Sequence, residues 1–277
     1  MISSLSNWMS QLSVVGLGGL LFAFALAGAF SGQLLWRRSH RESVPPGAGG
    51  ISETQEGYVV SAVLGLLALM LGFTLALAVD RFDTRRALVL EEANAIGTAY
   101  LRAQLLAEPH RARLSNLLVE YTDNRLALAS ASSRDMPTLL ARNDRLLTDV
   151  WTATSAAFPT VEQLDFSTSL LEAMNQVINL DIARKASRLA HVPALILIFL
   201  AVYIVATAGV LGYVLKGLRG QLAGAFLITL LTLVLVVIID LERPTAGGIQ
   251  ESQVPMQLFR ASLKKLPAEI SAGDQVR

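Results

Sequence analysis

The chain has 277 residues, of which 53% are hydrophobic and 16% are charged, and its formal net charge is +1. A mean hydropathy of +0.50 and so few charges exclude an ordinary soluble domain. The chain has no cysteine, which excludes disulfides and thiolate metal sites.

Four apolar stretches predict membrane spans. None contains Asp, Glu, Lys, Arg or His, and they cover residues 14–35, 59–79, 192–214 and 222–239. A bilayer core about 30 Å thick needs ~20 apolar helical residues, so each stretch is expected to cross as a helix. We interpret the first as a retained anchor, because nothing basic precedes it and "WRRSHR" follows it. A signal peptide is the alternative, since Ala25, Ala27 and Ala29 suit a peptidase.

The predicted fold is all-α, with four transmembrane helices and a helical bundle between the second and third. One helix over residues 58–106 is expected to leave the membrane and enter the bundle, since good helix formers continue until "EPH". Further helices are predicted at 110–130, 138–157 and 161–188, the last continuing through Pro193 into the third span. The bundle is thus built partly from extensions of membrane helices.

The predicted organisation therefore has five parts. They are residues 1–57 (first span and an exposed, mobile Pro/Gly/Ser-rich loop), 58–80 (second span), 81–190 (bundle), 191–240 (hairpin of spans three and four) and 241–277 (tail). The bundle carries 13 basic and 13 acidic residues, which argues against a nucleic-acid binder. In the tail, Met256, Phe259, Leu263 and Leu266 predict a short amphipathic helix that packs on the bundle or lies at the membrane surface.

Two arginines directly follow the second span. Arg81 and Arg85 are four residues apart, so they share a helical face and repel each other unless an anionic group lies nearby. The candidates are Glu92 and the segment "DLERP" at residues 240–244. One interpretation is a set of ion pairs and snorkelling anchors. The others are an electropositive vestibule and contact with lipid headgroups. The candidate residues are Arg81, Arg85, Arg86, Glu91, Glu92, Asn94, Asp240, Glu242 and Arg243.

The second span has two distinct faces. Small residues form one stripe (Ser61, Gly65, Ala68, Gly72, Ala76) and bulky residues form the other (Leu66, Met70, Phe73, Leu77). In one interpretation the small stripe, with Gly65 and Gly72, makes a tight helix contact and the bulky one faces lipid. In the other, Met70, Phe73 and Leu77 surround a symmetry axis as an apolar neck that gates by dewetting.

The chain shows little sign of an enzyme or an ion-coupled transporter. His40, His110 and His191 lie in unrelated contexts, and no HExxH, GxSxG, P-loop or dinucleotide-binding pattern occurs. No ionisable residue lies inside a span, whereas proton pumps and ion-coupled transporters usually need one there. We therefore expect no catalysis, no cofactor and no metal.

Two segments carry a family resemblance. "RFDTRRALVLEEANAIGTAYLR", residues 81–102, and "IIDLERPTAGGIQESQ", residues 238–253, resemble the bacterial bestrophin-like domain family over nearly the whole chain. The family is similar to the bestrophins, oligomeric anion channels whose second helix lines an apolar neck and whose middle helices form a cytosolic vestibule. The acidic cluster that binds calcium in animal bestrophins has no match here, so calcium gating is not implied.

From the residues and this resemblance together, we predict a homo-oligomeric channel for small anions in the bacterial inner membrane, whose partners are lipid, anions and its own copies. Seven basic residues border the spans on the bundle face and five on the loop face, which weakly places the bundle in the cytoplasm. The alternatives are a membrane-anchored sensor or scaffold, and a purely structural membrane protein that holds partners.

Overall fold

The computed structural model describes residues 13–39, 53–132, 134–244 and 247–263. These residues form helices and their connections, without any β-strand. The chain divides into two compact units. The first, here called the membrane unit, is Met1–Phe82 with Ala190–Gln250, and the second, the bundle unit, is Asp83–Leu189 with Glu251–Arg277. Most of the loop predicted after the first span, residues 40–52, lies outside the described residues.

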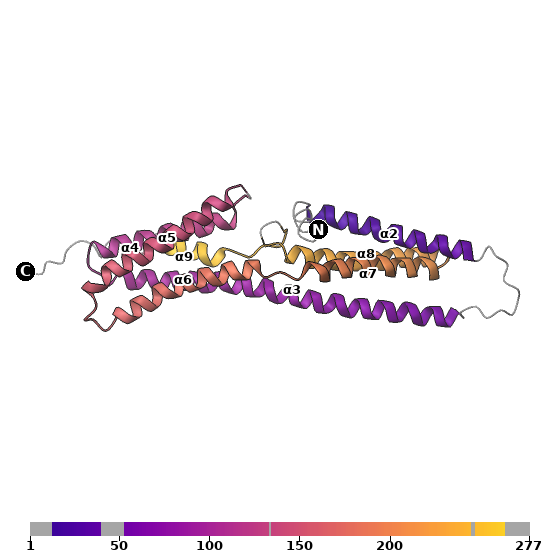
Figure 1. Ribbon diagram of the computed structural model, residues 1–277, viewed down its shortest axis with the longest axis horizontal. Coiled ribbons are helices and arrows are strands. Elements are labelled where there is room, and N and C mark those ends of the chain that lie inside the picture. The colour runs from indigo at the N-terminus through magenta and orange to yellow at the C-terminus, as the bar shows by residue number, and fades with distance from the viewer. Residues whose placement is uncertain (1–12, 40–52, 133, 245–246, 264–277) are drawn as a thin grey trace, which may run out of the picture. The chain divides into compact units, whose positions relative to one another are not determined.

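The membrane unit contains α2 (Val14–Ser39), α7 (Ala194–Val214), α8 (Gly217–Leu241) and the first part of α3 (Glu53–Ala103). Helix α2 packs along α7 and α8 (Figure 1). Among the described residues, four helical segments are long and apolar enough to cross a membrane, as the four apolar stretches predict. Helix α3 contributes Leu67, Leu71 and Ala78 to the buried core of this unit.

Helix α3 is one uninterrupted helix of 51 residues. It begins within the predicted loop at Glu53 and ends at Ala103, three residues before the predicted end. Leucine, alanine, arginine and glutamate dominate its second half, and these residues favour helix in water as well as in lipid. Its continuation past the apolar run explains why a membrane span leads directly into a charged segment.

Glycines bring α2 and α7 into close contact. A Cβ atom on Gly32 would lie 2.0 Å from the carbonyl oxygen of Gly209, and one on Gly212 would lie 2.0 Å from that of Ala29. Gly28 is similarly close to Val205. Backbones at this distance require glycine, as in membrane helix pairs joined by small residues. By contrast, no described atom of the chain's other segments lies within 4 Å of a Cβ built on Gly65 or Gly72, so their predicted packing role finds no partner in the described part of the chain.

The bundle unit contains the second part of α3, α4 (His110–Ala129), α5 (Met136–Ala157), the 3-10 helix η1 (Phe158–Thr160), α6 (Ser167–Leu189) and α9 (Val254–Leu263). Their apolar faces meet in one core that includes Ile96, Leu118 and Met174. The charges and hydroxyls of the unit's exposed positions surround this core, as expected for helices packed in water.

Of the two placements predicted for the tail helix, packing on the bundle is the one seen. Met256 of α9 is fully buried in the bundle core, and the ring of Phe259 lies 3.3 Å from the Cβ position of Gly97. Arg260 donates to both carboxylate oxygens of Asp123, at 2.6 and 3.0 Å. The predicted contribution of Leu266 lies outside the described residues.

The prediction of one helix through Pro193 is wrong. Helix α6 ends at Leu189 and α7 begins at Ala194, with an extended link between them. Proline removes a backbone donor and disfavours helical geometry at the residue before it. The N–H of that residue, Val192, donates to Oε2 of Glu242 at 2.6 Å, which replaces the lost helical acceptor. Among the helices that the structure describes, only α3 extends from a span into the bundle as a continuous helix.

Candidate functional site

Both arginines after the second span are held in ion pairs. Nη1 of Arg81 lies 3.6 Å from Oε2 of Glu242, and Nε of Arg85 lies 2.6 Å from Oε1 of Glu251. The Arg85 and Glu251 side chains are only 4% and 6% exposed. The charge of Arg85 is therefore neutralised inside the bundle unit, which agrees with the ion-pair interpretation of this motif. Glu242 was expected from "DLERP", whereas Glu251 was missed because it lies beyond that segment.

The segment after α8 is shaped by its own polar residues. Asp240 accepts hydrogen bonds from the backbone N–H of Gly248 at 2.7 Å and of Ile249 at 2.9 Å. A Cβ atom on Gly247 would lie 2.6 Å from the carbonyl oxygen of Asp240, so this turn requires glycine. Arg243, at the start of the turn, is half-buried. The signature after the last span thus fixes a turn and supplies the carboxylates of Glu242 and Glu251.

Glu92 is the centre of a buried polar cluster in the bundle unit. It is fully buried and accepts a hydrogen bond from the hydroxyl of Tyr121 at 2.6 Å. Arg125 of α4 and Arg184 of α6 both pair with its carboxylate. The sequence suggested Arg85 as its neighbour, but the real partners come from helices that follow it by 33 and 92 residues. Sequence spacing on one helix gives no information on such partners.

A second buried carboxylate, Asp181, extends the cluster. Its Oδ1 accepts from Arg125 at 3.2 Å and from the amide of Asn143 at 2.9 Å, while Lys185 lies 2.7 Å from Oδ2. Every member is bound by at least one other, and buried charges need such pairing. The cluster joins α3, α4, α5 and α6, and we interpret its role as holding these helices together.

The arginines of this cluster control nearby pKa values. Burial alone would raise the pKa of Glu92, but the charges of Arg125 and Arg184 and the Tyr121 hydroxyl outweigh it and lower the pKa. Burial, together with the charges of Arg184 and Arg125, lowers the pKa of Arg188 to about 10. The lowered pKa of Glu92 thus keeps its carboxylate ionised. In the described part of the chain, no group of three or more His, Asp and Glu residues is placed to hold a metal ion.

One face of α3 is exposed in the membrane unit. Leu66, Phe73 and Leu77 are exposed by 53%, 65% and 52%, and the next residue at this helical spacing is the exposed Asp80. Met70, which was grouped with them, is half-buried against the membrane core. The small stripe with Gly65 and Gly72 is also exposed, on an adjacent face. Of the two predicted stripes, only Met70 thus takes part in the intrachain contact of α3.

The same helical spacing continues on α3 in the bundle unit. The residues that it reaches are all exposed and mostly polar, and they are Thr84, Ala87, Glu91, Asn94 and Thr98. Arg86 is exposed as well but lies to the side of this line. Glu91 and Asn94 are therefore surface residues, whereas Glu92, beside them in sequence, is buried.

The chain matches known proteins in two comparisons. Residues 19–256 match the family model of the Bestrophin-like domain. Crystal structures of two point variants of a bacterial bestrophin homologue from Klebsiella pneumoniae are also similar. One has a TM-score of 0.69, 14% identity and coverage of 92% of this chain and 97% of that one. The other has a TM-score of 0.67, 13% identity and coverage of 89% and 96%. At this identity the likeness shows the fold. A comparison with curated proteins found no match.

Proposed function

Because the chain belongs to the bestrophin-like domain family, we propose that it is one subunit of a homo-oligomeric membrane channel for small ions, with α3 lining the pore. The bestrophins, which this family resembles, are anion channels, so small anions are the first candidate to permeate. The observation that carries the proposal is the exposed face of α3, because a ring of subunits requires a helix with free surface toward the axis.

Two adjacent exposed stripes suit α3 to this position. Each helix in a ring needs one face toward the axis and another against its neighbour. No atom of the other described segments lies within 4 Å of a Cβ built on Gly65 or Gly72, so these glycines leave room for a close approach by the next copy. Phe73 and Leu77 then face the axis as an apolar neck that excludes water when narrow. Met70 contributes less, since it is half-buried in its own subunit.

The exposed charges favour a second candidate, a channel for small cations. Arg85 is buried in an ion pair and Arg81 is paired with Glu242, so a basic mouth would depend mainly on Arg86. On the line that follows Phe73, the exposed ionisable residues are Asp80 and Glu91. Rings of carboxylates attract cations. The two candidates differ in the charge of the permeant ion, so one measurement of ion selectivity distinguishes them.

The deciding experiment is ion flux through liposomes that contain the full chain, followed by reversal potentials under a salt gradient. Protein-dependent flux supports the channel. Its absence in liposomes with confirmed incorporation contradicts the channel and favours the sensor or scaffold. For an anion channel, Arg86→Glu should lower the ratio of anion to cation permeability. For a cation channel, the double variant Asp80→Asn with Glu91→Gln should lower the ratio of cation to anion permeability. Arg113→Glu, an exposed change on α4, is the control in both cases.

We also propose that the bundle unit lies in the cytoplasm of a bacterium, as the bias in basic residues suggests. Because the chain has no cysteine, a single Cys at Glu120, which is 55% exposed on α4, gives a clean probe. A membrane-impermeant maleimide should label it in broken cells but not in intact spheroplasts. Equal labelling of both would reverse the orientation.

A further inference from the structure

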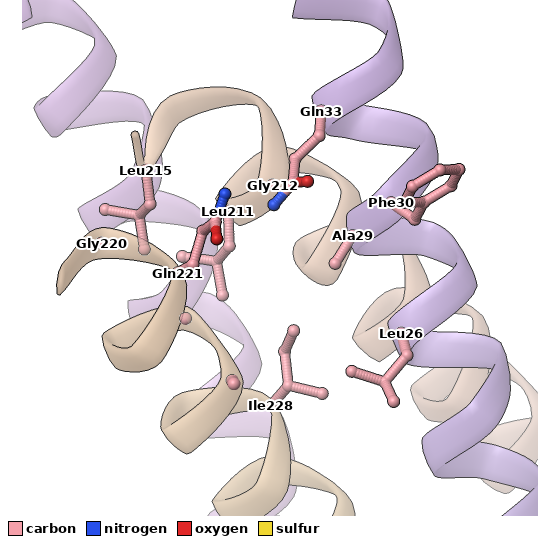
Figure 2. Close-up of a pocket in the computed structure, with 12 residues that line it drawn as sticks. Leu26, Ala29, Phe30, Gln33, Leu211, Gly212, Leu215, Gly220, Gln221 and Ile228 are labelled. Atoms are coloured by element: carbon pink, nitrogen blue, oxygen red, sulfur yellow. The ribbon is translucent and has the colours of Figure 1, made fainter. Parts of the chain in front are cut away.

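A cavity of about 210 Å³ lies between α2, α7 and α8 in the membrane unit. It is near the turn that joins α7 to α8, where Gly217 has a φ of 68°. Glycine at this position permits the left-handed geometry that so short a connection needs. Apolar residues line most of the cavity, among them Leu26, Leu211, Leu215 and Ile228 (Figure 2). A space of this character within a membrane span accepts a hydrocarbon chain.

Two amide side chains line one end of this cavity. Gln33 of α2 and Gln221 of α8 line it, and their amide groups turn toward each other from opposite sides (Figure 2). Leu26 and Ile228 lie about two turns from them along the same two helices. The cavity is thus polar at the end near the helix termini and apolar deeper in the membrane. Amides are expensive in hydrocarbon unless they find hydrogen-bond partners, and the ester groups of a lipid supply acceptors.

Basic residues continue this polarity beyond the cavity. Arg37 and Arg38 occupy the last turn of α2. Lys216 precedes α8, and its Nζ lies 5.4 Å from the centre of the Trp36 ring. Arg219 lies in the first turn of α8. The described helices α2, α7 and α8 carry no carboxylate before Asp240, near the opposite end of α8. This end of the three helices is therefore positive, without a counter-charge from the same helices.

We propose that the cavity binds one anionic glycerophospholipid. An acyl chain lies between Leu26, Leu211 and Ile228, the glycerol esters accept from Gln33 and Gln221, and the phosphate lies among Lys216, Arg219 and Arg37. Charge complementarity selects this occupant, because a zwitterionic headgroup would bring its own cation toward the arginines. The binding is independent of ion conduction and would hold the first span against the last hairpin.

Tryptophan fluorescence tests the proposal directly. The chain has three tryptophans, so Trp8→Phe and Trp151→Phe leave Trp36 as the reporter beside the site. Bromine on acyl chains quenches a tryptophan that it contacts. We expect brominated phosphatidylglycerol to quench Trp36 with a relative binding constant at least about fivefold above that of brominated phosphatidylcholine, the factor for one basic residue at an anionic surface. Equal quenching by the two lipids would overturn the proposal.

Matched variants separate a built site from general surface attraction. Arg219→Gln should remove most of the preference, whereas Arg113→Gln on α4 should keep it. Ala225→Phe fills the cavity and should abolish the preference, while Ala223→Phe, exposed on the same helix but outside the lining, should not. A preference that survives Ala225→Phe in folded protein, as judged by circular dichroism, would overturn the proposal, because charge alone would then explain it.

Discussion

The Nε atom of Arg85 lies 2.6 Å from Oε1 of Glu251, and both side chains are almost completely buried. The pair ties α3 to the segment that leads into α9. Because a buried charge without its partner is costly, this contact makes the fold of the bundle unit depend on a residue 166 positions away.

Removing one member of this pair should destabilise the protein strongly. We expect Glu251→Ala to lower the free energy of unfolding by about 3–5 kcal/mol, since the buried Arg85 loses the carboxylate that pairs with it. The double variant Arg85→Leu with Glu251→Leu should recover part of the loss. Denaturant unfolding of the purified chain measures both. Glu120→Ala, which breaks a pair whose side chains are 51% and 55% exposed, should change little, and an equally small effect of Glu251→Ala would refute the argument.

Acid should weaken the bundle unit through Glu92. The pKa of this carboxyl is lowered below its ordinary value of 4.5, so its ionised form stabilises the fold above that pH. The stabilisation is lost as the pH falls through the lower pKa of the folded state. We expect Glu92→Gln to be less stable at neutral pH and to lose less further stability on acidification. Unfolding curves from neutral pH to about pH 3 would show this, with the exposed Glu91→Gln as control.

The glycines of the membrane unit should divide into two classes. Gly212→Ala places a methyl group where Ala29 O is only 2.0 Å away, so it should separate α2 from α7 and reduce thermal stability. Gly72→Ala meets open space and should leave the stability of the single subunit unchanged. If Gly72 contacts the next copy as proposed, its variant should instead weaken the oligomer, which crosslinking in membranes would reveal. Equal thermal losses for both variants would contradict this division.

The proposed neck predicts a gain of conductance. Phe73 is 65% exposed in the single chain, so Phe73→Ala should leave the fold intact and widen the constriction, raising basal ion flux in liposomes. Phe199→Ala is a suitable control, since Phe199 is 50% exposed but belongs to α7. If only the Phe199 variant raised the flux, the neck would have to be assigned to a different helix.

Much of the fold could be predicted from the sequence, because its signals are local. Apolar length gave the four spans, and the run of helix formers after Asp80 gave the continuous α3. The error at Pro193 arose because proline is tolerated in some membrane helices and breaks others, according to whether a neighbour replaces its hydrogen bonds. Here Glu242 does so from a distant part of the chain.

The site was harder to predict, because it depends on contacts between distant segments. Helical spacing correctly placed Phe73 and Leu77 on one face, but it could not show that Met70 turns toward the core. It also could not show that Glu92 binds Arg125 and Arg184. The tight glycine contact was missed altogether, although Gly28 and Gly32 stand four residues apart in α2, which is the spacing that membrane helix pairs use.

The contact between α2 and α7 also has a consequence for how the protein assembles in the membrane during its synthesis. Residue 39 ends α2 and residue 194 begins α7, its glycine-matched partner. At roughly 5–20 residues per second, translation of the intervening chain takes about 8–30 s. During that time the first helix must remain in the lipid without its final neighbour. Helix α2 carries no ionisable residue before Arg37, so it can remain in the bilayer as a single helix until α7 has been synthesised.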